Sequence, residues 1–182
     1  MTASAESIPA DRLDLISLTP AFLDAALAAE HSRAEQILGL AIPNEWYRKQ
    51  ALMQRRLDQL RDDPLLQPWL LRGMGLRAER LMVGYIGFHT APDPEYLAEL
   101  APGGIELGYT VFAAHRRRGY AREACAALMQ WARQEHGVDR FVVSISPDNV
   151  PSLRLAESFG FRKIGSHMDE IDGLEYIFER RV

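Results

Sequence analysis

Hydrophobic residues along this chain follow two periods, one typical of strands and the other typical of helices. Alternating apolar positions, or short runs rich in β-branched and aromatic residues, predict strands because such side chains suit a pleated, half-buried surface. The clearest examples are the segments Leu81 to Phe88 and Ile105 to Phe112. In total, the pattern predicts strands at residues 13–18, 69–72, 81–88, 105–112, 140–146, 162–164 and 175–179.

Other segments carry apolar residues three and four positions apart, which predicts amphipathic helices. Thr19-Pro20 supplies a cap and a preformed first turn for a helix from about Phe22 to Ala34. Asn44 is expected to cap a second helix that extends to about Leu60. Two further helices are predicted at residues 120–134 and 151–159. Residues 90–104 hold three prolines and two glycines, so they predict a loop with at most a short turn.

The order of these elements indicates the fold class. Strands flanked by helices, with both hairpin-like and crossover connections, predict a mixed α/β fold. A chain of 182 residues without repeats or linkers fits one domain, residues 1–182, in which residues 1–9 are expected to form a flexible leader.

The composition of the chain argues against several classes of function. The formal net charge of −4 argues against general nucleic-acid binding. The chain has no apolar run as long as a membrane span and no signal-peptide pattern, so we expect no membrane partner and a cytoplasmic location. The one cysteine, Cys125, shares a helical stripe with Leu128 and Ala132, which favours a packed core thiol over a nucleophile.

The turn His115-Arg116-Arg117-Arg118-Gly119-Tyr120-Ala121-Arg122 is the most informative segment. It joins a predicted strand to a predicted helix, and the first backbone N–H groups of a helix have no partner within the helix. The helix dipole adds positive charge there, and arginines add more, so the turn predicts a phosphate site. A glycine lets the backbone approach a ligand closely. The alternative is a solvated basic turn.

The order Arg116-x-x-Gly119-x-Ala121 resembles the pyrophosphate loop of the GNAT superfamily of N-acetyltransferases. The family continues with a strand, an Asn-containing turn, a short helix and a Gly-Phe pair. Here residues 140–146, Asn149, residues 153–159 and Gly160-Phe161 follow in that order. The Asn-x-x-Ser spacing is most similar to the ribosomal-protein N-terminal (RimJ/RimL-type) acetyltransferases.

The resemblance implies a single-domain GNAT fold whose mostly antiparallel sheet is splayed at the cofactor site. It implies acetyl-CoA as co-substrate, an acetyl-CoA-binding core at residues 105–161, and an amine as acceptor. The acceptor would be a protein N-terminus or a small molecule. By resemblance, the backbone of one strand pairs with pantetheine, the turn binds the diphosphate and Asn149 bonds the pantetheine arm. The positions expected to bind the cofactor are Tyr109, Thr110, Val111, Arg116, Arg117, Arg118, Gly119, Tyr120, Ala121, Arg122, Asn149 and Ser152.

Glu106 is the candidate general base, because the family often places a carboxylate in this strand that takes the proton through water. A lysine amine, with a pKa of about 10.4, is rarely neutral near neutral pH, whereas an α-amine, with a pKa of about 7.7–8.0, often is. The base therefore matters more for lysine-like acceptors. The other interpretation of Glu106 is a strand carboxylate that faces solvent or joins a salt bridge.

The family commonly uses a tyrosine of the short helix as general acid, and Ala156 stands at that place here. Ser152 is the remaining candidate to assist the departing sulfur, although a hydroxyl at a helix start also serves as a cap. Asn149 has a similar structural alternative as a turn residue that bonds its own backbone.

The sequence supports four further expectations. The spacing of His, Cys, Asp and Glu predicts no metal site. His89, before the proline-rich loop, is a weaker candidate for a base or a substrate contact. The oligomeric state stays open, with a homodimer as one option. A CoA-binding module without catalysis is the alternative function, because Ala156 replaces the usual acid.

Overall fold

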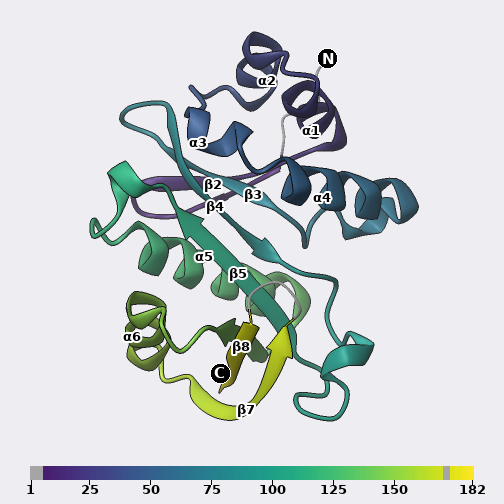
Figure 1. Ribbon diagram of the computed structural model, residues 1–182, viewed down its shortest axis with the longest axis vertical. Helices are drawn as coiled ribbons and strands as arrows, with labels where there is room; N and C mark the ends of the chain where they lie inside the picture. Colours follow the sequence, from purple (N-terminus) through teal and green to yellow (C-terminus); the bar gives the residue numbers. More distant parts are fainter. Residues whose placement is uncertain (1–5, 170–172) are drawn as a thin grey trace. The chain divides into compact units, whose positions relative to one another are not determined.

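The computed structural model describes residues 6–169 and 173–182, and these form a mixed α/β fold as predicted (Figure 1). They divide into two compact units. The first contains the chain up to Gly87 together with Tyr109–Leu128, and the second contains Phe88–Gly108 and the chain from Met129.

The sheet of the first unit is antiparallel through four strands, and the second half of β5 lies beside β4. The strands are β1 (Ser7–Pro9), β2 (Leu13–Ser17), β3 (Arg72–Leu76), β4 (Leu81–Phe88) and β5 (Ile105–Val111). Directly after β5, the N–H of Phe112 donates to the carbonyl of Val83 at 2.9 Å, which continues the β4–β5 contact.

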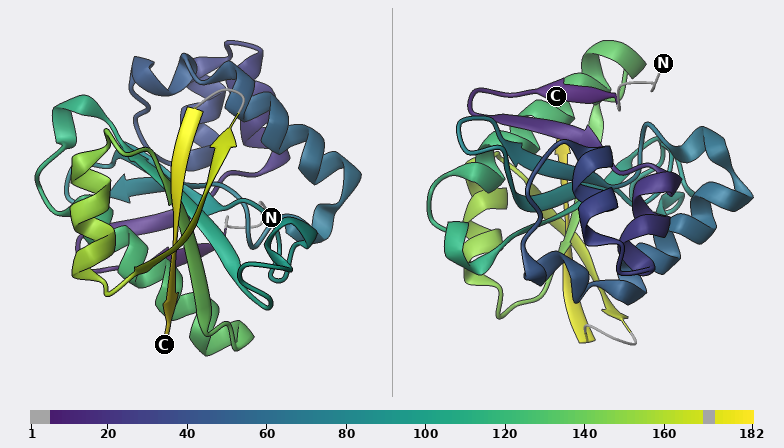
Figure 2. Two further views of the ribbon diagram at one scale, coloured as in Figure 1. Left: turned by 60° about the horizontal axis from the view of Figure 1, so that its bottom comes forward. Right: turned by 90° about the horizontal axis from the view of Figure 1, so that it is seen from above.

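Helices cover one face of this sheet. They are α1 (Pro20–Leu27), α2 (His31–Leu38), α3 (Asn44–Tyr47) and α4 (Gln50–Asp62), and Figures 1 and 2 show them together on one side of β2, β3 and β4. Large apolar side chains from these helices, including Phe22, Trp46 and Leu57, are buried against Met82 and Phe112. This layer forms the main core of the first unit.

Two of the predicted helices are each divided in two. The helix expected from Phe22 to Ala34 breaks after α1, where Ala29 adopts a φ of +57°, and α2 then begins at His31. The helix expected from Asn44 to Leu60 also breaks between α3 and α4, at Arg48 and Lys49. The apolar period continues across both breaks because the shorter helices bury side chains in the same core.

The second unit holds the other half of the sheet, in the order β5-β6-β8-β7. Its further strands are β6 (Arg140–Ile145), β7 (Arg162–Asp169) and β8 (Gly173–Arg181), and Figure 2 shows β7 and β8 as a long ribbon. The β5–β6 pair is parallel, with Ile105 opposite Phe141 and Glu106 opposite Val142.

The long helix α5 (Tyr120–His136) follows the predicted turn, and the short helix α6 (Val150–Ser158) follows β6. Both agree with the sequence prediction within two residues. The other differences are at element ends. Ser7–Pro9 forms β1 rather than the end of a leader, whose residues 1–5 lie outside the described residues. The strand predicted at residues 69–72 begins only at Arg72, and β7 and β8 are longer than predicted.

Candidate functional site

The turn between β5 and α5 contains two left-handed residues. After a short 3₁₀ helix, η3 (Ala113–His115), Arg117 has a φ of +60° and Gly119 a φ of +84°. Within the described part of the chain, no backbone hydrogen bond is donated by the N–H groups of residues 117–121. Left-handed turns of this kind direct successive N–H groups outward and make anion-binding concavities. The backbone therefore suits a phosphate ligand at the start of α5.

Side chains of the first unit hold this turn in shape. The Nε of Arg116 donates to the carbonyl of Val111 at 3.0 Å, which closes the turn onto the end of β5. The carboxylate of Glu45 in α3 accepts the N–H of Ala113 at 3.1 Å. The turn is thus fixed by both its own arginine and a neighbouring helix, which lowers the entropy cost of binding a ligand there.

Sequence reasoning missed a fifth arginine, which lies beside the four of the turn. Arg12 lies between β1 and β2, and its guanidinium stacks over the ring of Tyr120, 4.6 Å from the centroid. Its Nη2 would lie 3.3 Å from a Cβ placed on Gly119. The ring of Tyr120 is buried, so only the backbone of this residue is available to an anion.

Glu123, in the first turn of α5, holds Arg12 in place. Its carboxylate accepts hydrogen bonds from the backbone N–H groups of Arg12 and Leu13 and from the Nε of Arg12 at 2.8 Å. Burial by itself raises the pKa of the Glu123 carboxyl, but these hydrogen bonds and the charge of Arg12 outweigh it and lower the pKa. Glu123 is therefore ionised at neutral pH.

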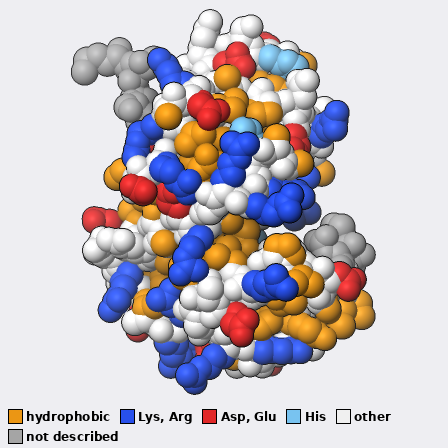
Figure 3. Space-filling view, turned by 90° about the vertical axis from the view of Figure 1, so that its left-hand side faces the viewer, with side chains coloured by type: hydrophobic (Ala, Val, Ile, Leu, Met, Phe, Trp, Pro, Cys, Tyr) orange, Lys and Arg blue, Asp and Glu red, His pale blue; other side chains and the backbone are white. Residues whose placement is uncertain are grey.

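The arginine side chains of the turn itself lie at the surface. Arg116, Arg117 and Arg118 are exposed, as is Arg122 in α5. Lys and Arg side chains are prominent on the face drawn in Figure 3. Cys125, by contrast, is buried, and burial raises the pKa of its thiol far above the ordinary value. The prediction of a packed core thiol is confirmed.

Tyr109, Thr110 and Val111 occupy the end of β5 in the first unit and are half-buried. A Cβ on Gly84 of β4 would collide with the carbonyl of Thr110, so the backbones of β4 and β5 lie very close at this point. Glycine is needed there because no side chain fits between the strands. The predicted backbone pairing of residues 109–111 with a ligand stays a prediction.

Glu106 lies in the second unit, in the part of β5 that pairs with β6. Its side chain is only 9% exposed, so the alternative of a carboxylate facing solvent is wrong, whereas the alternative of a salt bridge has a partner in His89 when that ring is protonated. Its Oε2 is 3.4 Å from the Nδ1 of His89. The N–H of His89 donates to the Glu106 carbonyl at 3.0 Å, and this cross-strand bond brings the two side chains side by side.

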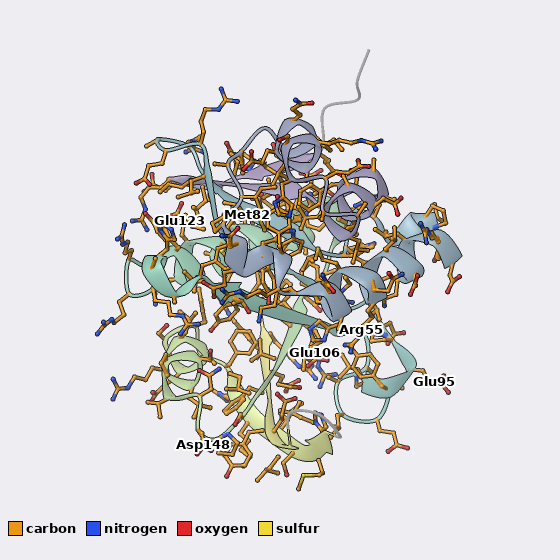
Figure 4. All side chains as sticks on the ribbon, turned by 45° about the horizontal axis from the view of Figure 1, so that its top comes forward. Arg55, Met82, Glu95, Glu106, Glu123 and Asp148 are labelled. Atoms are coloured by element: carbon orange, nitrogen blue, oxygen red, sulfur yellow. The ribbon has the colours of Figure 1, made fainter. Side chains whose placement is uncertain are left out.

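Three side chains hydrogen-bond the Glu106 carboxylate, namely His89, Ser144 of β6 and Tyr96 of η2 (Glu95–Leu97). Burial by itself raises the pKa of this carboxyl, but the hydrogen bonds and the charge of His89 outweigh it, so the pKa lies below its ordinary value. In Figure 4 Glu106 lies among other side chains, whereas Glu95 projects outward. The site thus keeps a buried carboxylate ionised beside an imidazole that is 41% exposed.

At the start of helix α6 in the second unit, Asn149 has a structural role, which was the alternative to cofactor binding. The side-chain oxygen of Asn149 accepts the N–H of Ser152 at 3.3 Å and caps the helix. Ser152 is half-buried in the first turn, and Ala156 is buried in the helix. The contacts of Asn149 and Ser152 with a cofactor stay predictions.

The predicted site residues are therefore divided between the units. The first holds Tyr109, Thr110, Val111 and residues 116–122, and the second holds Glu106, Asn149 and Ser152. Among the described residues, no group of three His, Cys, Asp or Glu side chains is arranged to hold a metal ion. Within residues 6–169 and 173–182, no helix has the length and apolar character needed to cross a bilayer.

A family model described as an acetyltransferase (GNAT) domain matches residues 12–162 and so spans both units. Two relatives from Bacillus subtilis (strain 168) are both named uncharacterized N-acetyltransferases. YjdG is 27% identical over 161 residues, which cover 83% of this chain and 86% of YjdG. YnaD is 29% identical over 90 residues, which cover 50% of this chain and 48% of YnaD.

Solved structures share the fold. A GNAT-family acetyltransferase from Bordetella pertussis is 25% identical with a TM-score of 0.66, covering 96% of this chain and 99% of that one. RimL, described as a ribosomal L7/L12 alpha-N-protein acetyltransferase and solved with coenzyme A, is 16% identical with a TM-score of 0.65. That match covers 97% of this chain and 98% of RimL, and at such low identity it shows the fold alone.

Proposed function

Because the chain belongs to the acetyltransferase (GNAT) family, it is an acyltransferase, and we propose that it moves the acetyl group of acetyl-CoA to a primary amine. The acceptor is a protein N-terminal α-amine or a small-molecule amine. We propose direct attack of the amine on the thioester while both substrates are bound.

The observation that carries this proposal is the turn between β5 and α5. It combines unpartnered N–H groups at residues 117–121, the N-terminal end of a 17-residue helix and five nearby arginines, including Arg12. Backbone donors and guanidinium groups both favour phosphate oxygens, and a diphosphate supplies several of them. The diphosphate of acetyl-CoA is the ligand we assign to this turn, with the backbone of residues 109–111 binding pantetheine.

Glu106 provides the carboxylate that draws the proton from the amine. Its ionised state suits this role because a carboxylate attracts the ammonium form of the amine and can accept its proton, although the hydrogen bonds that lower the pKa of Glu106 make it a weaker base than a free carboxylate. The neutral amine then attacks the thioester carbon, the carbon–sulfur bond breaks and CoA leaves as a thiolate. Ser152 is proposed to donate a hydrogen bond to that sulfur, since Ala156 has no proton to give.

A protein N-terminus is the favoured acceptor. Structures of similar fold include RimL, which is named for acetylation of a ribosomal protein α-amine, and a ribosomal-protein-serine acetyltransferase from Vibrio cholerae. The Asn149-x-x-Ser152 spacing resembles that of the RimJ/RimL-type acetyltransferases and therefore also favours a protein N-terminus. Acetylation of an α-amine also depends least on a general base, because an α-amine is often neutral near neutral pH.

The test is to incubate the protein with acetyl-CoA and a panel of amines, and to measure thiol release together with the mass of each acceptor. The panel contains peptides with free N-termini, lysine peptides, polyamines and aminoglycosides. We expect amine-dependent thiol release and an acetylated product. Tight CoA binding without turnover on any amine would instead select the alternative of a CoA-binding module without catalysis.

A further inference from the structure

Arg12 lies beside the turn in space but far from it in sequence. It is placed between β1 and β2, 111 residues before Glu123, and it stands outside the pattern Arg116-x-x-Gly119-x-Ala121. Arg12, Gly119, Tyr120 and Glu123 all belong to the first unit. The contacts among them are therefore defined within that unit alone.

Two contacts fix the guanidinium of Arg12. Its Nε donates to the Glu123 Oε2 at 2.8 Å, and its central carbon lies over the ring of Tyr120, 4.6 Å from the centroid. The Glu123 side chain is only 11% exposed and Tyr120 is buried, so both partners are themselves held in place. A guanidinium that is already fixed loses less conformational entropy when it binds a ligand.

The Nη2 end of the guanidinium is directed at the turn. It lies 3.3 Å from the Cβ position of Gly119. The contact with Glu123 is made by Nε, and a guanidinium carries five N–H donors in total. The Arg12 side chain is also 45% exposed, although it is held at two points. Its Nη groups are thus placed to reach an anion that binds to the backbone of the turn.

Glu123 places a negative charge beside the proposed phosphate site. It stands in the first turn of α5 and is ionised at neutral pH. A carboxylate there interacts favourably with the helix dipole, but it repels an approaching phosphate. Arg12 offsets this charge through Nε and adds donors on the side of Gly119.

Resting on the proposed function, we infer that Arg12 binds a phosphate group of acetyl-CoA directly, together with the backbone N–H groups of the turn. Nε stays with Glu123, and the Nη groups donate to phosphate oxygens beside Gly119. The phosphate belongs to the diphosphate or to the 3′-phosphate of the cofactor, because both present the same kind of oxygen to a guanidinium. Glu123 and Tyr120 act as positioning residues.

The variants Arg12→Ala and Arg12→Lys test this contact, with Arg61→Ala as a matched control. Arg61 is an arginine of the first unit that also pairs with a carboxylate at 2.8 Å, that of Asp24, and its side chain is 56% exposed. In calorimetry, we expect Arg12→Ala to bind CoA about 10- to 100-fold more weakly, the usual effect of losing a hydrogen bond to a charged group. Arg12→Lys should also bind more weakly, because an ammonium lacks the fork that joins Glu123 to the phosphate. Arg61→Ala should bind like the unaltered protein.

A double variant separates direct binding from neutralisation of Glu123. If Arg12 only offset that charge, Arg12→Ala combined with Glu123→Gln would recover the affinity of the unaltered protein. Direct binding predicts that the double variant stays at least about 10-fold weaker. Full recovery in the double variant, or full affinity in Arg12→Ala alone, would overturn the inference.

Three ligands show which phosphate Arg12 binds. If it binds the 3′-phosphate, Arg12→Ala should lose the preference of the protein for CoA over dephospho-CoA. If it binds the diphosphate, the variant should weaken CoA and dephospho-CoA by the same factor and should weaken inorganic pyrophosphate as well. Unchanged affinity for all three ligands would contradict the inference.

Nitrogen NMR of the guanidinium groups gives a result that depends neither on turnover nor on the stability of a variant. Titration of CoA into the unaltered protein should shift the Nε–H signal of Arg12 and leave that of Arg61 in place. An Arg12 signal that does not move at saturating CoA would refute the contact. If CoA moves the signal but no amine is acetylated, the proposed function fails and the inference stands. A folded protein that binds neither CoA nor pyrophosphate would overturn both.

Discussion

Glu123 in α5 binds Arg12 through both the backbone and the guanidinium of that arginine, across 111 residues of sequence. The same carboxylate also accepts the N–H of Leu13 at the start of β2. One side chain thus ties the first turn of α5 to the sheet and places a guanidinium beside Gly119. The turn that we propose to bind phosphate therefore receives part of its positive charge through this contact.

Glu123→Gln should lower the free energy of unfolding by about 1–3 kcal/mol at neutral pH, because three donors then share one acceptor oxygen. The folded-state pKa of Glu123 is lowered, so its contribution is present above the unfolded pKa of about 4.3 and is lost as pH falls through the folded value. Urea unfolding at about pH 7 and at acid pH measures the effect. Glu135→Gln, on an exposed part of the same helix, is the control, and an equal loss in both variants would contradict this role.

Gly119→Glu should abolish CoA binding by adding bulk and negative charge to the turn, while the protein stays folded. Gly137, at the other end of α5, has a similar left-handed φ of +68° and nothing within 4 Å of its Cβ position. Gly137→Glu therefore introduces similar backbone strain, about 1 kcal/mol, away from the proposed ligand. Calorimetry should show that only the Gly119 variant fails to bind. Normal affinity in that variant would remove the phosphate role of the turn.

Glu106→Gln should slow acetylation of a lysine peptide more than that of a peptide α-amine. The amide cannot take the proton from the amine, and a lysine needs that help most. We expect a loss of about 100-fold or more in kcat/KM for the lysine peptide at neutral pH. An equal loss with both acceptors, or none, would exclude Glu106 from proton removal.

Gly108→Ala should displace the ring of His89, which hydrogen-bonds the Glu106 carboxylate, and should lower kcat by about 10- to 100-fold, the effect of misplacing a reacting group by roughly 1 Å. Gly165→Ala in β7 is the matched strand control, because a Cβ there meets its nearest side-chain atom at 3.6 Å. Steady-state kinetics on both variants gives the comparison. Equal kcat values would show that the contact of His89 with Glu106 does not affect the reaction.

Local signals predicted the segment from β5 through α6 well. The strand at Ile105, the turn with Gly119 and the stripe of α5 each depend on neighbouring residues, and all three appear within two residues of the expected ends. The break at Ala29 was missed because the apolar period continues from α1 into α2 while the backbone does not. Periodicity reports which face is buried but not whether the helix is continuous.

The site contacts that the sequence did not predict join residues far apart in the chain. Nothing near Arg12 indicates that it lies beside Tyr120, and nothing near His89 indicates that its ring faces Glu106. Both contacts depend on which strands are adjacent and on their register. Resemblance identified Glu106 as a catalytic candidate, but only the fold shows that it is buried and paired.

Titration of acetyl-CoA into the folded protein by calorimetry tests the central claim most directly. The account predicts saturable one-site binding that weakens with dephosphorylated, truncated pantetheine analogues and disappears in Gly119→Glu but not in Gly137→Glu. Absence of binding heat at several temperatures, with the protein shown to be folded by circular dichroism, would contradict it.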